Sequence, residues 1–211
     1  MTRVRIRVLA FTDPHGSIRA AESIIALARE AMPYAIVCAG DISIFGSGHE
    51  EFLNRLAVDL GDDVYYVPGN HDISISHKIN AAWDFMHELT YKALELPQVT
   101  LMGLPGSGHY WPSKRAATED CETPISLFSE RSTDRPSVLV THFPPSHLRA
   151  VDGSGSDSTD AGGSGNVRRI VATTRPDLVI CGHYHSCFGA RAKMLGVQVV
   201  NPGPSGCIYE L

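Results

Sequence analysis

Long apolar runs are missing from this chain. Its longest uninterrupted apolar stretches have about five to seven residues, whereas a helix that crosses a bilayer needs about 20. The opening segment, MTRVRIRVLAF, contains no secretory apolar region, which argues against an export signal. These absences lead us to expect no membrane partner and a cytoplasmic location.

Positive charge and paired cysteine motifs are also scarce. The chain has 18 Lys and Arg against 23 Asp and Glu, a formal net charge of -5. It shows no basic, aromatic-interleaved stripe, which disfavours nucleic acid as a partner and nuclease activity as a function. The five cysteines include no CxxC pair. Cys38 and Cys181 fall in or at the end of predicted buried strands, where a reduced thiol acts as a small hydrophobic group.

The length of 211 residues fits one domain, 1–211, with a substantial core. Apolar runs predict strands, and apolar positions at helical spacing predict helices. In chain order the first five elements are a strand over 3–12, a helix over 17–29 with Ser17 as its N-cap, a strand over 35–39, a helix over 49–60 and a strand over 64–67. This βαβαβ order predicts an α/β fold with parallel strands.

The second half of the chain has a weaker pattern. We predict a helix over 80–96, strands over 99–104, 138–141 and 177–181, a helix over 167–174 capped by Ser164 or Asn166, and an apolar run over 194–200 before a turn at 201–204. Residues 105–136 are interpreted as loops with a short helix. The segment 152–166 is rich in Gly, Ser and Asp; it is either a flexible surface linker or a loop that presents backbone N–H groups to a phosphate.

Side chains that bind metals follow five of the predicted strands. Because open α/β sheets place their sites at the carboxyl ends of their strands, we expect these groups to converge on one sheet edge. Imidazole with carboxylate suits Mn, Fe, Zn, Co or Ni better than Mg or Ca. The groups are Asp13 with His15, Asp41, Asn70 with His71 and Asp72, His142, and His183 with His185.

Each of these short motifs is weak alone, because Asp-x-His or Gly-Asp occurs by chance in many proteins. Together they are informative, since five of the ten histidines lie at predicted strand ends. No chemistry is assigned to the other five, which are His49, His77, His87, His109 and His147. His109 and Trp111 could touch a substrate, but a packing role is the simpler interpretation.

In order and spacing, the motifs DxH, GD, GNHD, H and GHxH over residues 13–185 resemble the calcineurin-like metallophosphoesterase family. Within it, the chain is similar to the compact phosphodiesterase-like members of bacteria and archaea. The resemblance implies a four-layer αββα sandwich of two mixed β-sheets flanked by helices, with a dimetal site at the strand ends. It also implies that 105–136 and 152–166 are variable loops near the site.

The resemblance further implies two divalent transition-metal ions, with manganese the first choice in vitro. One ion would be held by Asp13, His15, Asp41 and His185, and the other by Asp41, Asn70, His142 and His183, so that Asp41 bridges. A hydroxide between the ions would attack a small phosphoester, a diester in preference to a monoester. Asn70 and His71 would contact the substrate, and His71 would act as the general acid. A homo-oligomer is compatible with the sequence.

The second motif departs from the family pattern. Many members continue it as GDxxD or GDxxDR, but here Ile44 occupies the position of the extra Asp and no Arg follows. This disfavours the phosphoprotein phosphatase branch and leaves His71 without its usual orienting carboxylate; Asp72 is a candidate replacement. A non-catalytic scaffold of the same fold, like the retromer subunit that resembles this family, is the alternative function. The complete ligand set favours the enzyme.

Overall fold

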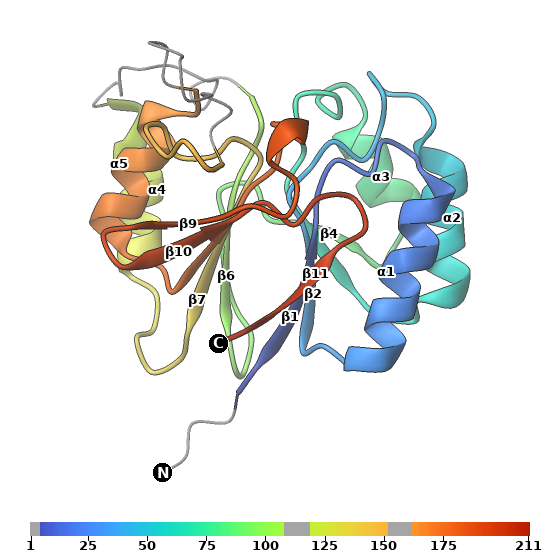
Figure 1. The fold of residues 1–211 in the computed structure, drawn as a ribbon, viewed down its shortest axis with the longest axis horizontal. Helices are drawn as coiled ribbons and strands as arrows, with labels where there is room; N and C mark the ends of the chain where they lie inside the picture. Colours follow the sequence, from blue (N-terminus) through green and yellow to red (C-terminus); the bar gives the residue numbers. More distant parts are fainter. Residues whose placement is uncertain (1–4, 108–118, 152–161) are drawn as a thin grey trace.

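The structure, a computed structural model, describes residues 5–107, 119–151 and 162–211. In this part of the chain two mixed β-sheets pack face to face, and helices cover the outer face of each sheet (Figure 1). The four-layer α/β arrangement expected from the resemblance is therefore confirmed.

The first sheet has the strand order β11-β1-β2-β3-β4. Its strands are β1 (Arg7–Phe11), β2 (Ala35–Cys38), β3 (Val64–Tyr66), β4 (Met86–Glu88) and β11 (Cys207–Glu210). Strands β1 to β4 are parallel, and β11 pairs with β1 in the antiparallel direction. The predicted parallel βαβαβ unit is thus confirmed.

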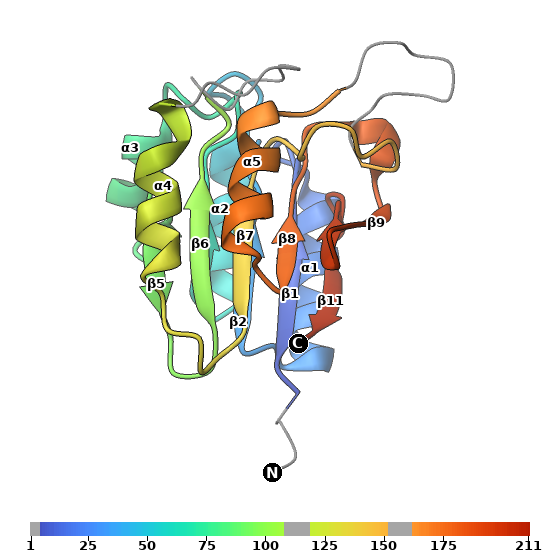
Figure 2. The same cartoon turned by 90° about the vertical axis from the view of Figure 1, so that its left-hand side faces the viewer.

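The second sheet has the order β5-β6-β7-β8-β10-β9. Its strands are β5 (Ala93–Glu95), β6 (Thr100–Leu104), β7 (Ser137–Thr141), β8 (Leu178–Ile180), β9 (Arg191–Met194) and β10 (Val197–Val200). The four inner strands are parallel, and β5 and β9 form antiparallel edges. Both sheets direct the carboxyl ends of their parallel strands to the same end of the molecule (Figure 2).

Helices close the two outer faces. The helices α1 (Ile18–Ala31), α2 (His49–Asp59) and α3 (Ser76–Ala82) cover the first sheet, and α4 (Glu119–Ser129) and α5 (Gly165–Thr174) cover the second. The side chain of Ser17 accepts a hydrogen bond from the backbone of Ala20 and so caps α1, as predicted. Ser164 caps α5 in the same way through the N–H of Val167.

Alternate residues of β1 face different layers. Leu9 and Phe11 pack into the core beneath α1 and α2, while Val8 and Ala10 pack between the sheets. All four side chains are fully buried, and the burial of each large one stabilises the fold by roughly 1.5–3 kcal/mol. The layer between the sheets is made mostly of Val, Ala and Leu, side chains small enough for two sheets to pack about 10 Å apart.

The prediction of a helix over 80–96 is wrong. Helix α3 ends at Ala82, and the segment then forms the short strands β4 and β5. Each of these strands has three residues, too few to show alternation. Their hydrogen-bonding partners, β3 and β6, lie outside the segment, so its own apolar spacing could not reveal them.

Two further differences concern the end of the chain. The run over 194–200 contains a hairpin: β9 and β10 are joined through Leu195 and Gly196, both with positive φ. Strand β11 was not predicted. Residues 108–118 and 152–161 lie outside the described residues, and with them His109, Trp111 and part of the predicted variable loops.

Candidate metal centre

The candidate ligands meet where the two sheets end. Asp13, Asp41 and Asn70 follow β1, β2 and β3 of the first sheet, whereas His142 and His183 follow β7 and β8 of the second. The sequence interpretation had placed all of them on one sheet edge. Two sheets contribute instead, because β7 and β8 pair with each other and with β6 and β10, not with β1 to β3.

The backbone bends sharply to bring these side chains together. Asp13, His15, Asp41 and His183 all have left-handed φ, between 45° and 70°. Non-glycine residues in this region cost roughly 1–2 kcal/mol each, and such strained residues cluster at functional sites. Gly69 allows a close approach of two loops, since a Cβ there would lie 2.1 Å from Asp41 Oδ1.

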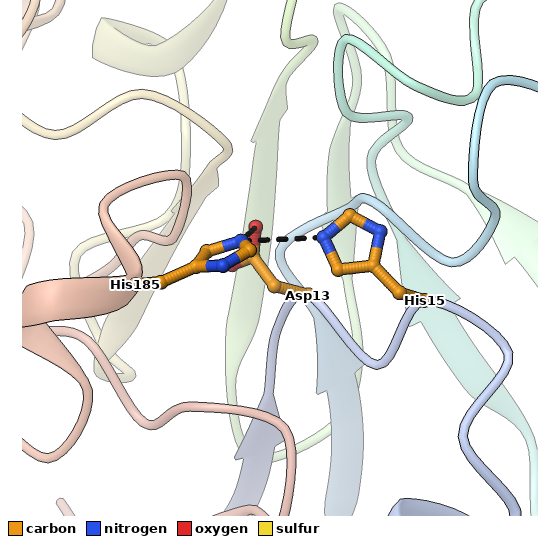
Figure 3. Close-up of side chains that lie close together, drawn as sticks. All are labelled: Asp13, His15 and His185. Carbon is orange, nitrogen blue, oxygen red and sulfur yellow. Dashed lines mark hydrogen bonds and ion pairs between the residues drawn. The ribbon is translucent and has the colours of Figure 1, made fainter.

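One group of ligand atoms surrounds the carboxylate of Asp13. The side chains of His15 and His185 point toward each other beside it (Figure 3), with their Nε2 atoms 3.2 Å apart. His185 Nε2 lies 3.5 Å from Asp13 Oδ1, and His15 Nε2 lies 4.0 Å from Asp41 Oδ2. The ligand atoms of Asp13, His15 and His185 all lie within 4.8 Å of one another.

A second group surrounds the amide oxygen of Asn70. His142 Nε2 lies 2.9 Å and His183 Nδ1 lies 3.0 Å from Asn70 Oδ1. The same His142 nitrogen lies 3.5 Å from Asp41 Oδ2. Asp41 Oδ2 is therefore close to both groups, which is the position that a bridging carboxylate would need.

The hydrogen bonds of two histidines decide which ring nitrogen faces the centre. His142 Nδ1 donates to the carbonyl of Ala39 at 2.8 Å, and His15 Nδ1 donates to the carbonyl of Ser43 at 2.9 Å. In the neutral rings Nε2 then carries a lone pair. His142 Nε2 consequently faces Asn70 Oδ1, an acceptor facing an acceptor. Such atoms repel unless a cation lies between them, so this donor set fits metal ions.

Burial and charge shift the acidities in the site. Burial lowers the pKa of His183 to about 4, which leaves its imidazole neutral and able to bind a metal at neutral pH. Burial would raise the pKa of Asp13, but its hydrogen bonds with His185, Thr12 and the backbone of His183 help to lower it overall. The hydrogen bond with Asp13 raises the pKa of His185. Burial raises the pKa of Asp41.

His71 lies beside these groups. Its backbone N–H donates to Asp41 Oδ1 at 2.9 Å, and its Nε2 lies 3.9 Å from Asp41 Oδ2. Among the described residues, its buried Nδ1 has no hydrogen-bond partner. The ring of Phe45 stacks on the imidazole, with centroids 3.8 Å apart and planes at 22°.

Asp72 does not take the orienting role considered for it. Its Oδ2 accepts from the backbone N–H groups of Ile42 and Gly69, and its Oδ1 accepts from the N–H and hydroxyl of Ser43. The carboxylate therefore joins the loop after β2 to the loop after β3.

The sequence did not indicate two aromatic stacking contacts of the site. Phe45 stacks on His71, and Phe188 stacks on His185 with centroids 5.0 Å apart. Both aromatic rings are exposed, so apolar periodicity gives no signal for them. The only sequence signal at Phe45 is a large aromatic residue directly before a turn glycine.

Comparison with known proteins identifies the class and then the family. The fold is that of a metallophosphoesterase, and a family model described as calcineurin-like phosphoesterase matches residues 6–187. Because this match covers most of the chain, the protein belongs to the calcineurin-like phosphoesterase family. Membership supports a hydrolase that binds divalent metal ions. No match to a protein of curated function was found.

Several solved structures share the fold. TT1561 of Thermus thermophilus has a TM-score of 0.69 and 20% identity over 95% of this chain and 90% of that one. A dimetal phosphatase from Danio rerio has a TM-score of 0.62 and 14% identity over 93% and 86%. GAP50, the anchor in the inner membrane complex of Plasmodium, has a TM-score of 0.65 and 13% identity over 98% and 81%. At these identities the likeness shows the fold alone.

Among the described residues, no helix has both the length and the apolar character needed to cross a membrane.

Proposed function

We propose that the protein is a dimetal-dependent phosphoesterase that hydrolyses a small phosphoester, a diester in preference to a monoester. The observation that carries this proposal is the convergence of imidazole, amide and carboxylate acceptors from two sheets around Asp41. Acceptors packed this closely need cations between them, and two adjacent groups share one carboxylate.

The two groups correspond to two metal positions. Asp13, His15 and His185 would hold one ion, Asn70, His142 and His183 the other, and Asp41 both. This donor set favours Mn, Fe, Zn, Co or Ni, with manganese the first to test. When bound, such ions supply a nucleophilic water at neutral pH and positive charge for the phosphoryl oxygens.

The charges of the protein favour an anionic substrate once the ions are present. Asp13 and Asp41 supply only two negative charges against the four positive charges of two divalent ions, so the centre stays positive. Residues 42–48 contain no Arg that could neutralise the additional charge of a monoester. This supports a diester as the preferred substrate.

His71 is assigned as the general acid. It lies at the centre, with Nε2 directed toward Asp41. Each of the two proposed metal positions already has four donor residues without His71. From the centre, the Nε2–H of His71 can donate its proton to the leaving oxygen, a contribution of about 10²–10⁴-fold for a poor leaving group. Asn70, next to it, would contact the phosphoryl group as well as a metal ion.

The cysteines bear on the cellular compartment. No disulfide joins any of the five, all of which lie among the described residues, and this supports a reducing compartment. We therefore retain the cytoplasm as the proposed location.

The decisive assay compares bis-p-nitrophenyl phosphate with p-nitrophenyl phosphate. Each is tested with added Mn²⁺, Fe²⁺, Zn²⁺, Co²⁺ or Ni²⁺, with and without chelator. We expect chelator-sensitive hydrolysis that is faster for the diester. The absence of such hydrolysis with every metal would instead indicate a non-catalytic scaffold.

The His71→Ala variant tests the acid. It should bind two equivalents of Mn²⁺ in a calorimetric titration but lose about 10²–10⁴-fold in kcat on diphenyl phosphate, whose phenolate leaves poorly. His77→Ala, at an exposed position of α3, is the matched control and should behave like the wild type. Wild-type turnover in metal-replete His71→Ala would show that another group donates the proton.

A further inference from the structure

Phe45 occupies a strained position in a tight turn. Ile44 and Ser47 exchange two backbone hydrogen bonds, of 2.8 and 3.0 Å, and the two residues between them have φ of 48° (Phe45) and 83° (Gly46). Turns of this kind usually take Asn-Gly or Gly-Gly, because left-handed φ is unfavourable for a bulky residue. Burial does not compensate for this strain, since 74% of Phe45 is exposed.

The strained turn holds His71 at two places. The Phe45 ring stacks on the imidazole at 3.8 Å. The backbone N–H of Gly46 and the hydroxyl of Ser43 both donate to the carbonyl oxygen of His71, at 3.1 and 2.9 Å. With the bond from the His71 N–H to Asp41, the backbone of His71 is fixed on both sides, and the aromatic ring lies over its side chain.

Within residues 5–107, 119–151 and 162–211, no hydrogen bond fixes the orientation of the imidazole itself. Its Nδ1 is buried without a partner among the described residues, the carboxylate of Asp72 is occupied by backbone groups, and Ile44 offers only hydrocarbon. Among the described residues, the ring's other contacts are the carboxylate of Asp41, whose Oδ2 lies 3.9 Å from Nε2, and two aromatic rings. Phe45 stacks on it, and His15 lies at 5.0 Å between centroids with a 60° tilt.

We propose that Phe45 is the positioning residue of His71, and that its stacked ring replaces the carboxylate that would otherwise orient the imidazole. The proposal rests on the proposed function, because it assumes that His71 donates the proton. Phe45 acts through His71 and not on the reacting atoms. Offset aromatic pairs have a defined geometry, so the stack restricts rotation of the imidazole and keeps Nε2 directed at the centre.

Two diesters with the same core shape separate this role from substrate binding. Bis-p-nitrophenyl phosphate has a good leaving group that needs little protonation, whereas diphenyl phosphate needs the acid. Misplacement of a catalytic group by about 1 Å can cost 10²-fold, so Phe45→Ala should lower kcat for diphenyl phosphate by about tenfold or more. Its KM, and the rate with bis-p-nitrophenyl phosphate, should stay within about twofold of the wild type.

Three further variants complete the set. Phe45→Tyr keeps the stack and should restore kcat. Phe45→Gly relieves the left-handed strain and should raise the melting temperature while being as slow as Phe45→Ala, which separates positioning from folding. Ile44→Ala, at the neighbouring half-exposed position, should leave both rates unchanged.

An NMR measurement on the metal-free protein reports the stack without reference to activity. A ring stacked on His71 shields its imidazole C–H protons, so these resonances should lie upfield in the wild type and Phe45→Tyr. They should move downfield in Phe45→Ala and Phe45→Gly.

The outcomes distinguish the two proposals. Equal losses on both diesters in Phe45→Ala would show that Phe45 contacts substrate and would overturn the positioning role. Unchanged kinetics in Phe45→Ala, with His71→Ala still impaired, would overturn it while the proposed function stands. A wild-type protein without chelator-sensitive activity would overturn both.

Discussion

Removal of the Asp72 carboxylate should destabilise the protein strongly, although Asp72 holds no proposed metal. The carboxylate is fully buried and accepts four hydrogen bonds of 2.8–3.0 Å: from the N–H groups of Ile42, Ser43 and Gly69, and from the hydroxyl of Ser43. The single proton of the Ser43 hydroxyl is shared between Asp72 and the carbonyl of His71, so in Asp72→Ala it can turn fully to that carbonyl, but the three N–H groups lose their acceptor.

The expected magnitude follows from these three groups. A hydrogen bond to a charged partner contributes about 1.5–3 kcal/mol, and the breaking of a buried charged network costs about 3–5 kcal/mol. Water that enters the vacated space would satisfy part of the loss. We therefore expect the free energy of unfolding to fall by about 4 kcal/mol in Asp72→Ala. Asp72→Asn keeps one acceptor oxygen and should lose about 2 kcal/mol.

Urea denaturation with excess chelator is the appropriate assay, because bound metal would add its own stabilisation. The m value should be unchanged. Asp62→Ala, at an exposed acidic position of the first half of the chain, is the control and should shift stability by less than about 0.5 kcal/mol.

Two results would refute the reasoning. A loss below about 1 kcal/mol in Asp72→Ala would mean that the four hydrogen bonds contribute little. Wild-type stability in Asp72→Asn, together with the kinetic defect of His71→Ala, would return Asp72 to the role of orienting the acid.

Two smaller changes test the backbone of the site and the cap of α1. A Cβ at residue 182 would lie 2.0 Å from Thr12 Oγ1 and 2.5 Å from Asp13 Oδ2. Gly182→Ala should therefore lose about 1–3 kcal/mol of stability and about tenfold in Mn²⁺ affinity, measured by calorimetry. Wild-type affinity in this variant would argue against Asp13 as a ligand. Ser17→Ala removes the cap of α1 and should lower the free energy of unfolding, measured by urea denaturation, by about 1 kcal/mol. Ser23 is the control, because its hydroxyl donates only to a carbonyl of its own helix. Ser23→Ala should lower the free energy of unfolding by less than about 0.5 kcal/mol.

The sequence predicted the parts of the fold that have local signals. The helix after Ser17 has a capping hydroxyl and a repeated apolar face, and β1, β2 and β3 lie in apolar runs with a candidate ligand a few residues beyond each. The structure places these elements where the pattern indicated. Family membership, predicted from the order of five motifs, is confirmed by the family match.

The rest depended on contacts between distant segments. The strand Met86–Glu88 exists because β3 provides its hydrogen-bonding partner, and Ala93–Glu95 exists because β6 does. In the site, the sequence indicated which residues could bind metal, and the structure brings them together, but their role as ligands stays a prediction. The contact between Phe45 and His71 joins two separate loops through an exposed ring, which no local pattern encodes.

The antiparallel pairing of β11 with β1 has a consequence for how the chain folds. Arg7 pairs with Glu210 and Ala10 with Cys207, so the strand that leads to Asp13 is joined on one side by residues near the other end of the sequence. Closing a connection of this length is slow, and until it closes one edge of β1 offers unpaired backbone groups to other chains. During synthesis, the sheet that carries Asp13, Asp41 and Asn70 therefore keeps an open edge until residues 207–210 arrive, and aggregation competes with folding over that interval.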